Sequence, residues 1–370
     1  MASDLDPRAR VATLQVALVA FALAVLVSGW ILVRNDNDPA MMLAFGVEAP
    51  RLVDHAEDVL GRDIPLLSGY GHDGRFFFLQ ALDPWVLEPD DGPATLLGRP
   101  LYRSQRMLLP MVSSGGGLVP DTWLPWTMLL TNLVSIGVGT AATARVAARR
   151  GATPWIGLAF AANIGVVIAM GIGAGGVIAF ATAMLGIDQI ERRRVWPAVA
   201  WFAAAALARE AMVFFAFGVA LAEWRREGRM PLRFLFVPGA VIAWAGYLRL
   251  RLPGGSGSDE VIELGPPFRG FLDAADRWAF GGLGTLDVVL PVLIAIAIAV
   301  VVRVAARELD PLAWGAAASA VLVVLLARPV WQNYYDISRA AAPILTAAIV
   351  VAFAPRPSDR PVVSDPVGVA

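Results

Sequence analysis

The sequence predicts an all-α fold, a polytopic transmembrane helix bundle of about 10–11 membrane segments with a structured first extracytoplasmic loop. The chain of 370 residues is 57% hydrophobic and only 16% charged, whereas soluble domains average about 45–50% apolar and about 25% charged residues. The excess lies in long apolar blocks, such as the uncharged run 11–33. Because a bilayer-spanning helix needs roughly 20 apolar residues, this composition excludes an ordinary cytoplasmic enzyme.

Charge and residue usage exclude several other classes of protein. The net charge is -1, so no overall basic field exists to attract nucleic acid, and we expect no nucleic-acid partner. The chain has no cysteine, which excludes disulfides, thiolate metal sites and cysteine nucleophiles. All 30 basic residues are arginine, so Schiff-base and P-loop lysine chemistry is also excluded.

The first apolar block is expected to be a retained anchor. Arg8 and Arg10 precede the uncharged run 11–33, as they would in a secretory signal. The run is longer than the 7–15 residues of a signal hydrophobic region, however. We therefore expect it to remain in the protein as a membrane helix.

Ten apolar segments divide the chain. They lie near 11–33, 122–144, 154–170, 174–190, 195–208, 211–222, 233–248, 285–302, 312–327 and 340–354. Segments 195–208 and 211–222 are short for full crossings and are predicted to form a hairpin of tilted half-length helices. A further short segment, 105–114, is predicted to be re-entrant or interfacial, because a full crossing would place later arginines on the wrong side.

Arginine placement orients this stack. The clusters lie at 145–150, 192–194, 225–229, 303–307 and 356–360. With ten crossings, the positive-inside rule places all of them and both termini on the cytoplasmic side of the inner membrane. The connections that then face outward are 34–103, 171–173, 209–210, 249–284 and 328–339.

The outward connection 34–103 is the one sizeable piece outside the membrane segments. It carries twelve Asp or Glu against six Arg. Apolar residues within 52–60 have helical spacing, with Gly61 as the expected stop, and the aromatic run 76–85 is typical of a helix lying at the membrane interface. We expect one transmembrane domain over 1–354, which includes this loop, a Gly/Ser/Pro-rich mobile linker within 249–284 and a disordered cytoplasmic tail at 355–370.

Asp73 is the leading candidate for chemistry. It lies between Gly71 and Gly74 in a predicted turn, directly before an aromatic run. Such a carboxylate suits a general base or a metal ligand facing a cavity. The alternative is that Asp73 only caps the following helix. His72 has a weaker claim, because a lone surface histidine usually has no function.

Three further polar clusters are predicted on the outward side. Arg103 and Arg106 share a helical face and suit bidentate binding of phosphate, or else snorkelling towards lipid headgroups. Arg209 and Glu210 separate two apolar segments, where charges are costly and often functional, although two such neighbours could simply pair with each other. Asp336 could pair with Arg339, which could instead serve as an anion ligand.

The order of these motifs resembles that of bacterial integral-membrane proteins related to the GT-C glycosyltransferase superfamily. The motifs are His72-Asp73-Gly74-Arg75-Phe76-Phe77, Asp83-Pro84, Tyr102-Arg103-Ser104-Gln105-Arg106 leading to Pro110, Ala208-Arg209-Glu210, and Asp336 to Arg339 with Pro343. The resemblance extends from about residue 70 to about residue 345. Each motif is short, and the order rather than any single motif carries the resemblance.

The resemblance implies an activity and roles for named residues. It implies transfer of a sugar from a polyprenyl-phosphate donor to an envelope glycan or lipid acceptor at the outer face of the membrane. Asp73 takes the acidic role, as a base or as a ligand to a divalent cation such as Mg²⁺ or Mn²⁺. The candidate substrate-binding residues are His72, Arg75, Arg103, Arg106, Glu210, Asp336 and Arg339.

One departure from the family pattern keeps a second function open. Many relatives carry an acid-containing stretch near 170, where this chain has the uncharged residues 170–175. The alternative is therefore a non-catalytic transporter or scaffold protein of lipid-linked glycan assembly. Membrane lipids are expected partners under either interpretation, and the sequence indicates no particular protein partner.

Overall fold

The computed structural model describes residues 5–252, 264–280 and 285–353. Within these ranges the secondary structure is helical, and the only extended pairings are isolated bridges such as that between Phe45 and Gly71. The predicted all-α class is confirmed. The predicted tail 355–370 and part of the predicted linker within 249–284 lie outside the described residues.

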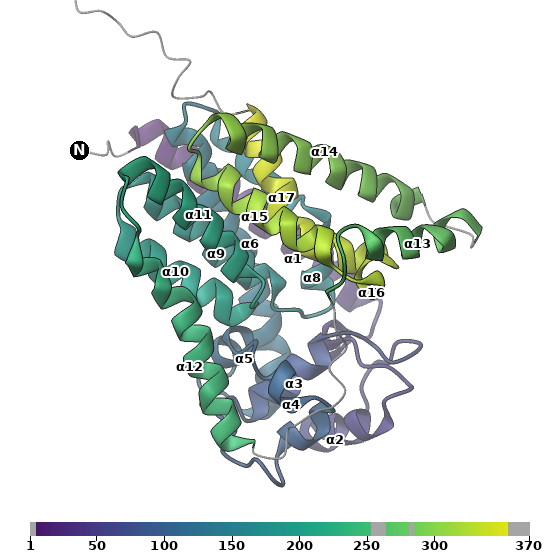
Figure 1. Ribbon diagram of the computed structural model, residues 1–370. Coiled ribbons are helices and arrows are strands. Elements are labelled where there is room, and N and C mark those ends of the chain that lie inside the picture. Colours follow the sequence, from purple (N-terminus) through teal and green to yellow (C-terminus); the bar gives the residue numbers. More distant parts are fainter. Residues whose placement is uncertain (1–4, 253–263, 281–284, 354–370) are drawn as a thin grey trace, which may run out of the picture.

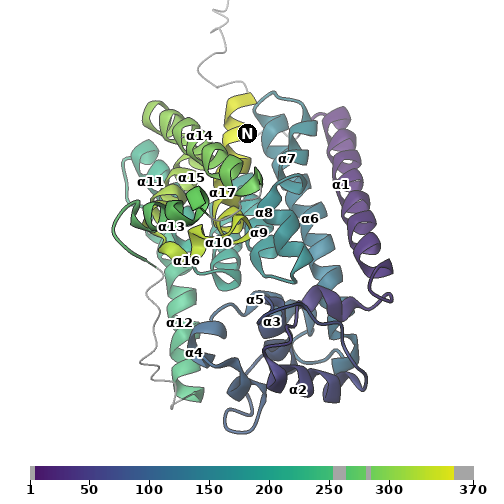
Figure 2. The same cartoon turned by 90° about the vertical axis from the view of Figure 1, so that its right-hand side faces the viewer.

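The helices form two layers, which lie one above the other in Figures 1 and 2. The bundle layer holds the long apolar helices together with the short pair α7 and α8. Its members are α1 (Pro7–Val33), α6 (Leu124–Arg149), α7 (Leu158–Ala161), α8 (Ile164–Gly171), α9 (Gly176–Glu191), α10 (Val195–Ala208), α11 (Met212–Glu227), α14 (Thr285–Arg307), α15 (Pro311–Leu325) and α17 (Tyr334–Phe353). The loop layer holds short helices of the first long connection: η1 (Pro39–Leu43), α2 (Pro50–Leu60), α3 (Gly74–Leu82), η2 (Pro93–Leu97), α4 (Pro100–Arg103) and α5 (Leu108–Ser113).

The remaining elements connect or flank the two layers. They are η3 (Asp121–Trp123), η4 (Pro154–Gly157), η5 (Leu232–Leu235), α12 (Phe236–Arg251), α13 (Arg269–Phe280) and α16 (Arg328–Trp331). Helix α12 runs beside the loop layer in Figure 2 and is fastened to it by its side chains. Trp244 donates a hydrogen bond to the carbonyl of Ser104 at 2.8 Å, and Tyr247 donates one to the carbonyl of Trp85 at 2.6 Å.

Each of the ten predicted apolar segments is helical, but their lengths differ. Five described helices are long and apolar enough to cross a membrane: Pro7–Val33, Asp121–Arg149, Leu232–Arg251, Asp287–Arg307 and Tyr334–Phe353. A sixth span is possible if the pair Pro154–Ala161 and Ile164–Gly171, bent by 48°, is one broken crossing. The chain therefore has the composition of a multi-pass membrane protein.

The other apolar helices are shorter than full spans. Helices α9, α10, α11 and α15 have 14 to 16 residues, or roughly 21–24 Å at 1.5 Å per residue. The bilayer core is about 30 Å thick, so the predicted 10–11 segments include helices that reach only part of the way. Helix α5 has six residues and is too short to cross, in agreement with the predicted re-entrant or interfacial segment.

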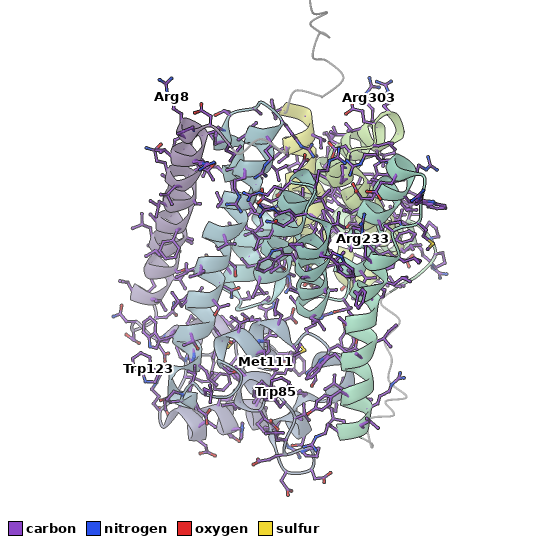
Figure 3. The ribbon with its side chains drawn as sticks, turned by 90° about the vertical axis from the view of Figure 1, so that its left-hand side faces the viewer. Arg8, Trp85, Met111, Trp123, Arg233 and Arg303 are labelled. Carbon is purple, nitrogen blue, oxygen red and sulfur yellow. The ribbon has the colours of Figure 1, made fainter. Side chains whose placement is uncertain are left out.

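The arginine-rich ends of the bundle helices lie together, as predicted. Asp188 at the end of α9 forms an ion pair with Arg145 of α6, with 3.0 Å between Oδ2 and Nε, and also pairs with Arg149. Arg150 bonds both Glu191, at 2.8 Å, and Asp310, which caps α15. In Figure 3, the labelled Arg8 and Arg303 lie at this same end, whereas Trp85 and Trp123 lie towards the other.

The loop layer contains both helices that the sequence predicted, α2 and α3. Helix α2 ends where the sequence indicated, because Gly61 takes the left-handed conformation (φ 67°) and its N–H bonds the carbonyl of Glu57. Helix α3 was expected to lie at the membrane interface, and this placement stays a prediction. Phe77 and Phe78 are buried in the core, and Phe78 packs edge-on against Phe45 with ring centres 6.0 Å apart.

A close backbone contact fixes the start of α3 against the bundle. A Cβ atom added to Gly74 would lie 2.5 Å from the carbonyl oxygen of Ile172 and 2.6 Å from that of Leu43. Only glycine fits such an approach. The contact places the preceding residue, Asp73, at the boundary between the two layers.

Candidate functional site

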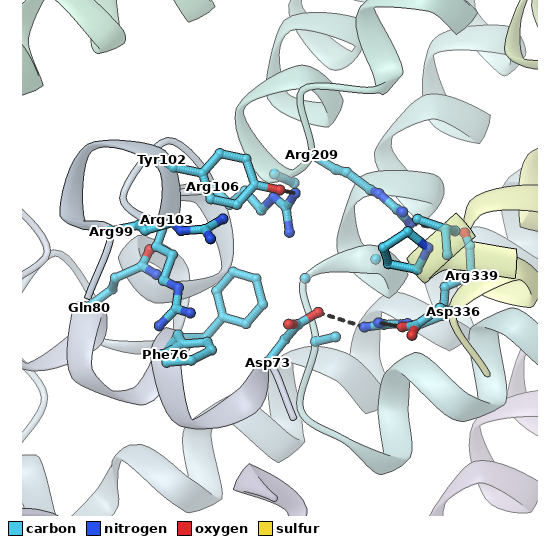
Figure 4. A pocket seen from close by; sticks show the side chains of 17 residues that line it. Asp73, Phe76, Gln80, Arg99, Tyr102, Arg103, Arg106, Arg209, Asp336 and Arg339 are labelled. Carbon is cyan, nitrogen blue, oxygen red and sulfur yellow. Dashed lines mark hydrogen bonds and ion pairs between the residues drawn. The ribbon is translucent and has the colours of Figure 1, made fainter. Parts of the chain in front are cut away.

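A cavity of about 290 Å³ lies where the loop layer meets the bundle layer. Its walls come from segments that are far apart in the sequence: the start of α3, the region of α4, the turn before α9, the turn between α10 and α11, and the segment from α16 to the start of α17. Four of the five connections predicted to face outward thus contribute to or adjoin one site. Figure 4 shows the charged side chains that face this cavity.

Asp73 faces the cavity and does not cap its helix. It occupies the N-cap position of α3 but makes no side-chain capping bond. Its Oδ2 instead accepts a hydrogen bond of 2.7 Å from Nη1 of Arg339, which follows 266 positions later. The alternative that Asp73 is only a helix cap is therefore excluded by its geometry.

The pKa of Asp73 is set by opposing effects. Burial favours the neutral acid and would raise the pKa, but the charges of Arg339, Arg106 and Arg209 outweigh burial and lower the pKa to about 2. The carboxyl group is thus ionised at neutral pH. Its side chain keeps 37% of its surface exposed, so it remains accessible from the cavity.

Arg339 is held by two carboxylates from different parts of the chain. Besides Asp73, it pairs with Asp336, which lies three residues earlier on α17. The predicted pairing within this helix is therefore present, and Asp73 shares the same guanidinium. Arg339 is only 13% exposed, so its ionic partners fix the position of its side chain.

Arg209 donates a hydrogen bond to a backbone carbonyl of α17 that a proline leaves without its usual helical donor. Pro343 lies inside α17 and has no N–H group to donate to the carbonyl four residues earlier. That carbonyl belongs to Arg339, and Nη1 of Arg209 donates to it at 2.9 Å. The proline thus provides an acceptor that ties the α10–α11 turn to α17.

Arg106 and Glu210 form a second link between the layers. Two nitrogens of Arg106 donate to the two carboxylate oxygens of Glu210, at 2.7 and 3.0 Å. This bidentate geometry is the strongest form of such a pair. Arg106 also donates to the hydroxyl of Tyr102 at 2.8 Å. Glu210 therefore pairs across the layers rather than with its neighbour Arg209.

Arg103 lines the loop-layer wall of the cavity. Its guanidinium lies 3.3 Å from the centre of the Phe76 ring and donates to the carbonyl of Leu97. Burial and the nearby charge of Arg75 lower the pKa of Arg103 to about 10, although Asp73 acts in the opposite direction. The group is still charged at neutral pH. Within the described ranges, Arg103 forms no ion pair.

Besides Glu210, which pairs with the lining residue Arg106, two predicted residues lie beside the cavity rather than on its wall. His72 packs edge-on against Tyr335 with ring centres 5.3 Å apart, and burial followed by the charge of Arg339 lowers its pKa. Arg75 is 8% exposed and lies 4.5 Å from the ring centre of Phe76. Neither is among the described lining residues, whereas Asp73, Arg103, Arg106, Asp336 and Arg339 all are.

The donor set does not fit the divalent cation that the resemblance implied. Asp73 and Asp336 already share a guanidinium, and five of the described lining residues are arginines. Their positive charge would oppose a divalent cation. No group of three or more His, Asp or Glu side chains suited to a metal exists among the residues the structure describes, and we derive no chemistry through a metal here.

Sequence reasoning missed some of the cavity residues. Arg99 and Gln80 line the cavity but were not predicted, and Arg209 and Tyr102 were noted only as parts of motifs. The spacing of Arg99 from Arg103 was a usable signal, because residues four apart share one helical face. Comparison of the chain with protein-family models, curated proteins and solved structures gave no match in any of the three, so the similarity to the GT-C superfamily stays a prediction from the motifs.

Proposed function

We propose that this protein is a membrane glycosyltransferase that moves a sugar from a polyprenyl-phosphate donor to an envelope glycan or lipid acceptor. The observation that carries the proposal is the meeting of one accessible carboxylate, Asp73, with five arginines in one cavity beside a helical membrane bundle. Arginine is suited to bind phosphate. A carboxylate beside bound phosphate is the minimum needed for sugar transfer with inversion.

The proposed reaction balances with one base. The acceptor hydroxyl oxygen forms a bond to the anomeric carbon while the bond from that carbon to the phosphate oxygen breaks. The bonding electrons leave with the phosphate, and the hydroxyl proton passes to Asp73. A phosphate leaves as an anion and needs no strong general acid, unlike the leaving group in glycoside hydrolysis, which requires a second carboxyl.

Donor binding would prepare Asp73 for this role. A carboxylate with a pKa of about 2 accepts a proton poorly. An anionic phosphate bound in the same cavity would offset the arginine charges that lower this pKa, so the pKa of Asp73 would rise. The carboxylate would thus become a better base only when the donor is in place.

The orientation of the bundle supports an active site at the outer face of the inner membrane. The arginine-rich helix ends and Arg8 lie at the end of the bundle away from the loop layer. By the positive-inside rule this end and both termini are cytoplasmic. The cavity then opens on the outer side, where the polyprenyl tail can remain in the bilayer while the sugar enters.

The decisive test uses the full chain in nanodiscs with a polyprenyl-phosphate sugar and membrane-derived acceptor. Asp73→Asn removes the base but retains the shape, and we expect loss of transfer by at least about 100-fold. Asp63→Asn, at an exposed position in the same loop layer, is the matched control and should retain activity. Full transfer by Asp73→Asn, at wild-type folding, would remove the proposal.

One observation favours the second function, a non-catalytic transporter or scaffold. Asp73 is already paired with Arg339, as it would be in a protein that only binds a lipid-linked glycan. This function predicts that wild type and Asp73→Asn translocate or retain the lipid-linked substrate equally and that neither transfers sugar. Transfer by the wild type that depends on Asp73 would exclude it.

A further inference from the structure

The charges around the cavity fall into three groups that differ in their balance. Arg106 is matched by Glu210. Arg209 and Arg339 are joined through the bond to the Arg339 carbonyl, and two carboxylates, Asp73 and Asp336, lie in the same group. The third group contains arginines alone. In Figure 4 it lies across the cavity from Arg209 and Arg339.

This third group is Arg99 with Arg103, here called the α4 arginine pair. Arg99 is the N-cap residue of α4, and the N–H of Arg103 bonds its carbonyl at 3.0 Å, so the two residues are one helical turn apart. Both line the cavity. In the part of the chain that the structure describes, neither has a carboxylate partner. With Glu210 counted, the five cavity arginines exceed the carboxylates by two charges. Arg209 also forms no ion pair among the described residues, but Asp73 and Asp336 lie in its group, whereas the α4 arginine pair has no carboxylate in its group.

Within the α4 arginine pair, the Arg103 side chain is held in place by its neighbours. The Arg103 guanidinium is held against Phe76 and by the Leu97 carbonyl, and both arginines are only partly exposed. The buried Arg75, whose Nε and Nη1 have no hydrogen-bond partner, adds a third positive charge beside Phe76. Gathering like charges away from water is unfavourable unless an anion joins them. The arginines on this side of the cavity are therefore suited to bind a ligand with at least two negative charges.

We infer that the α4 arginine pair is the subsite for the departing phosphate, and that it binds a phosphomonoester dianion in preference to a phosphodiester. The inference rests on the proposed function. The sugar donor is a diester with one negative charge, whereas the released polyprenyl phosphate is a monoester with about -1.5 to -2 at pH 7. The two guanidiniums of the α4 arginine pair complement the charge of the released monoester better than that of the diester donor.

This assignment separates the roles of the cavity arginines. The negative charge on phosphate grows as the bond to the sugar breaks, so the α4 arginine pair stabilises the transition state more than the bound donor. Arg339 acts instead as a positioning residue, since its charge is already shared by two carboxylates. The same preference predicts inhibition by the lipid-phosphate product.

The experiment compares two probes that differ by one methyl group and by the negative charge that this group removes. Geranyl phosphate and its methyl ester are titrated against the full chain in detergent, and Kd is followed by thermal shift and calorimetry. We expect the monoester to bind about tenfold more tightly than the diester, which corresponds to one lost charge-assisted hydrogen bond. Inorganic phosphate is the third arm and tests whether the lipid tail contributes.

The variants assign this preference to particular side chains. Arg103→Gln and Arg99→Gln should each bring the two probes to similar affinity, and Arg249→Gln, at an exposed arginine on α12, should leave the tenfold preference unchanged. Arg99 makes no described side-chain bond, so its variant tests the inference even if Arg103→Gln fails to fold. Retained preference in folded Arg99→Gln and Arg103→Gln would overturn the inference.

Further outcomes separate this inference from the proposed function. Asp73→Asn should retain the monoester preference while losing sugar transfer. If wild type binds monoester through the α4 arginine pair but transfers no sugar, the subsite stands and the proposed enzyme does not. Equal affinity for inorganic phosphate and geranyl phosphate, lost in Arg99→Gln, would assign the subsite to free phosphate and overturn the lipid-phosphate assignment.

Discussion

The two ends of helix α9 present the same residue types with different pairing. At its far end, Asp188 is 1% exposed and receives Arg145, Arg149 and Arg192 from one side of the bundle. At its start, the turn at 174–176 lines the cavity, where arginines exceed carboxylates. The carboxylate at the far end is surrounded by its cations, whereas the cavity has arginines that no carboxylate matches.

The comparison teaches that pairing, rather than the presence of arginine, distinguishes the two regions. Arg150 bonds both Glu191 and Asp310 and thereby ties α6, α9 and the start of α15 together. Such a closed network holds helices in place. At the cavity, the guanidiniums of Arg99 and Arg103 have no carboxylate partner among the described residues, so they can bind an added anion. We therefore expect substitutions at the far end to affect folding, and substitutions at the cavity to affect ligands.

The largest expected effect on stability is at Asp188. Asp188→Asn would leave three arginines around a neutral side chain in a buried setting, and removal of one partner from a buried ionic group costs about 3–5 kcal/mol. Thermal unfolding in detergent, followed by size-exclusion chromatography, measures the loss. Asp63→Asn is the control for a surface carboxylate. A stable Asp188→Asn variant would break the contrast between the two ends.

The next effect concerns the backbone contact that places Asp73. Gly74→Ala would bring a Cβ within 2.5 Å of the Ile172 carbonyl, and overpacking of this kind costs typically about 1–3 kcal/mol. Because α3 must shift, we expect anion binding to weaken along with the melting temperature. Gly171→Ala is the matched control, since its Cβ would meet nothing within 4 Å. Equal behaviour of the two variants would show that this contact is not needed.

A smaller effect is expected for the ion pair between the layers. Asp73 is partly exposed, so solvent weakens its attraction to Arg339. In a double-mutant cycle of Asp73→Asn and Arg339→Gln, we expect a coupling energy of about 1 kcal/mol in thermal unfolding. A coupling near zero would mean that the pair does not hold the layers together.

The smallest effect is the dependence of this pair on pH. The pKa of Asp73 is lowered from 3.8 to about 2, so its contribution to stability is complete well above pH 4 and is lost as the pH falls through about 2. The difference in melting temperature between wild type and Asp73→Asn should therefore be constant from pH 7 to pH 5 and shrink below pH 4. A difference that already vanishes at pH 5 would contradict the lowered pKa.

Several features were predictable from local sequence because their causes are local. The ten apolar segments became helices, and Gly61 ended α2 through its left-handed conformation. The position of Asp73 between glycines and the arginine spacing in 103–106 also singled out residues that the structure places in one cavity. The burial of Phe77 and Phe78 in α3 was not predicted, because an aromatic composition suits both a membrane interface and a buried core. This burial depends on contacts with Phe45 and the bundle, which are distant in the sequence.

The amino-acid sequence by itself determined which segments are helical and which residues bear charge, because apolar spacing, turn residues and proline act over a few positions. Tertiary structure alone decided which charges meet. Asp73 pairs with Arg339, which is 266 positions away, and Arg106 pairs with Glu210, which is 104 positions away. Arg99 and Arg103 line the same cavity and have no carboxylate partner among the described residues. Charge balance in a cavity depends on distances between helices, which no local pattern of residues specifies.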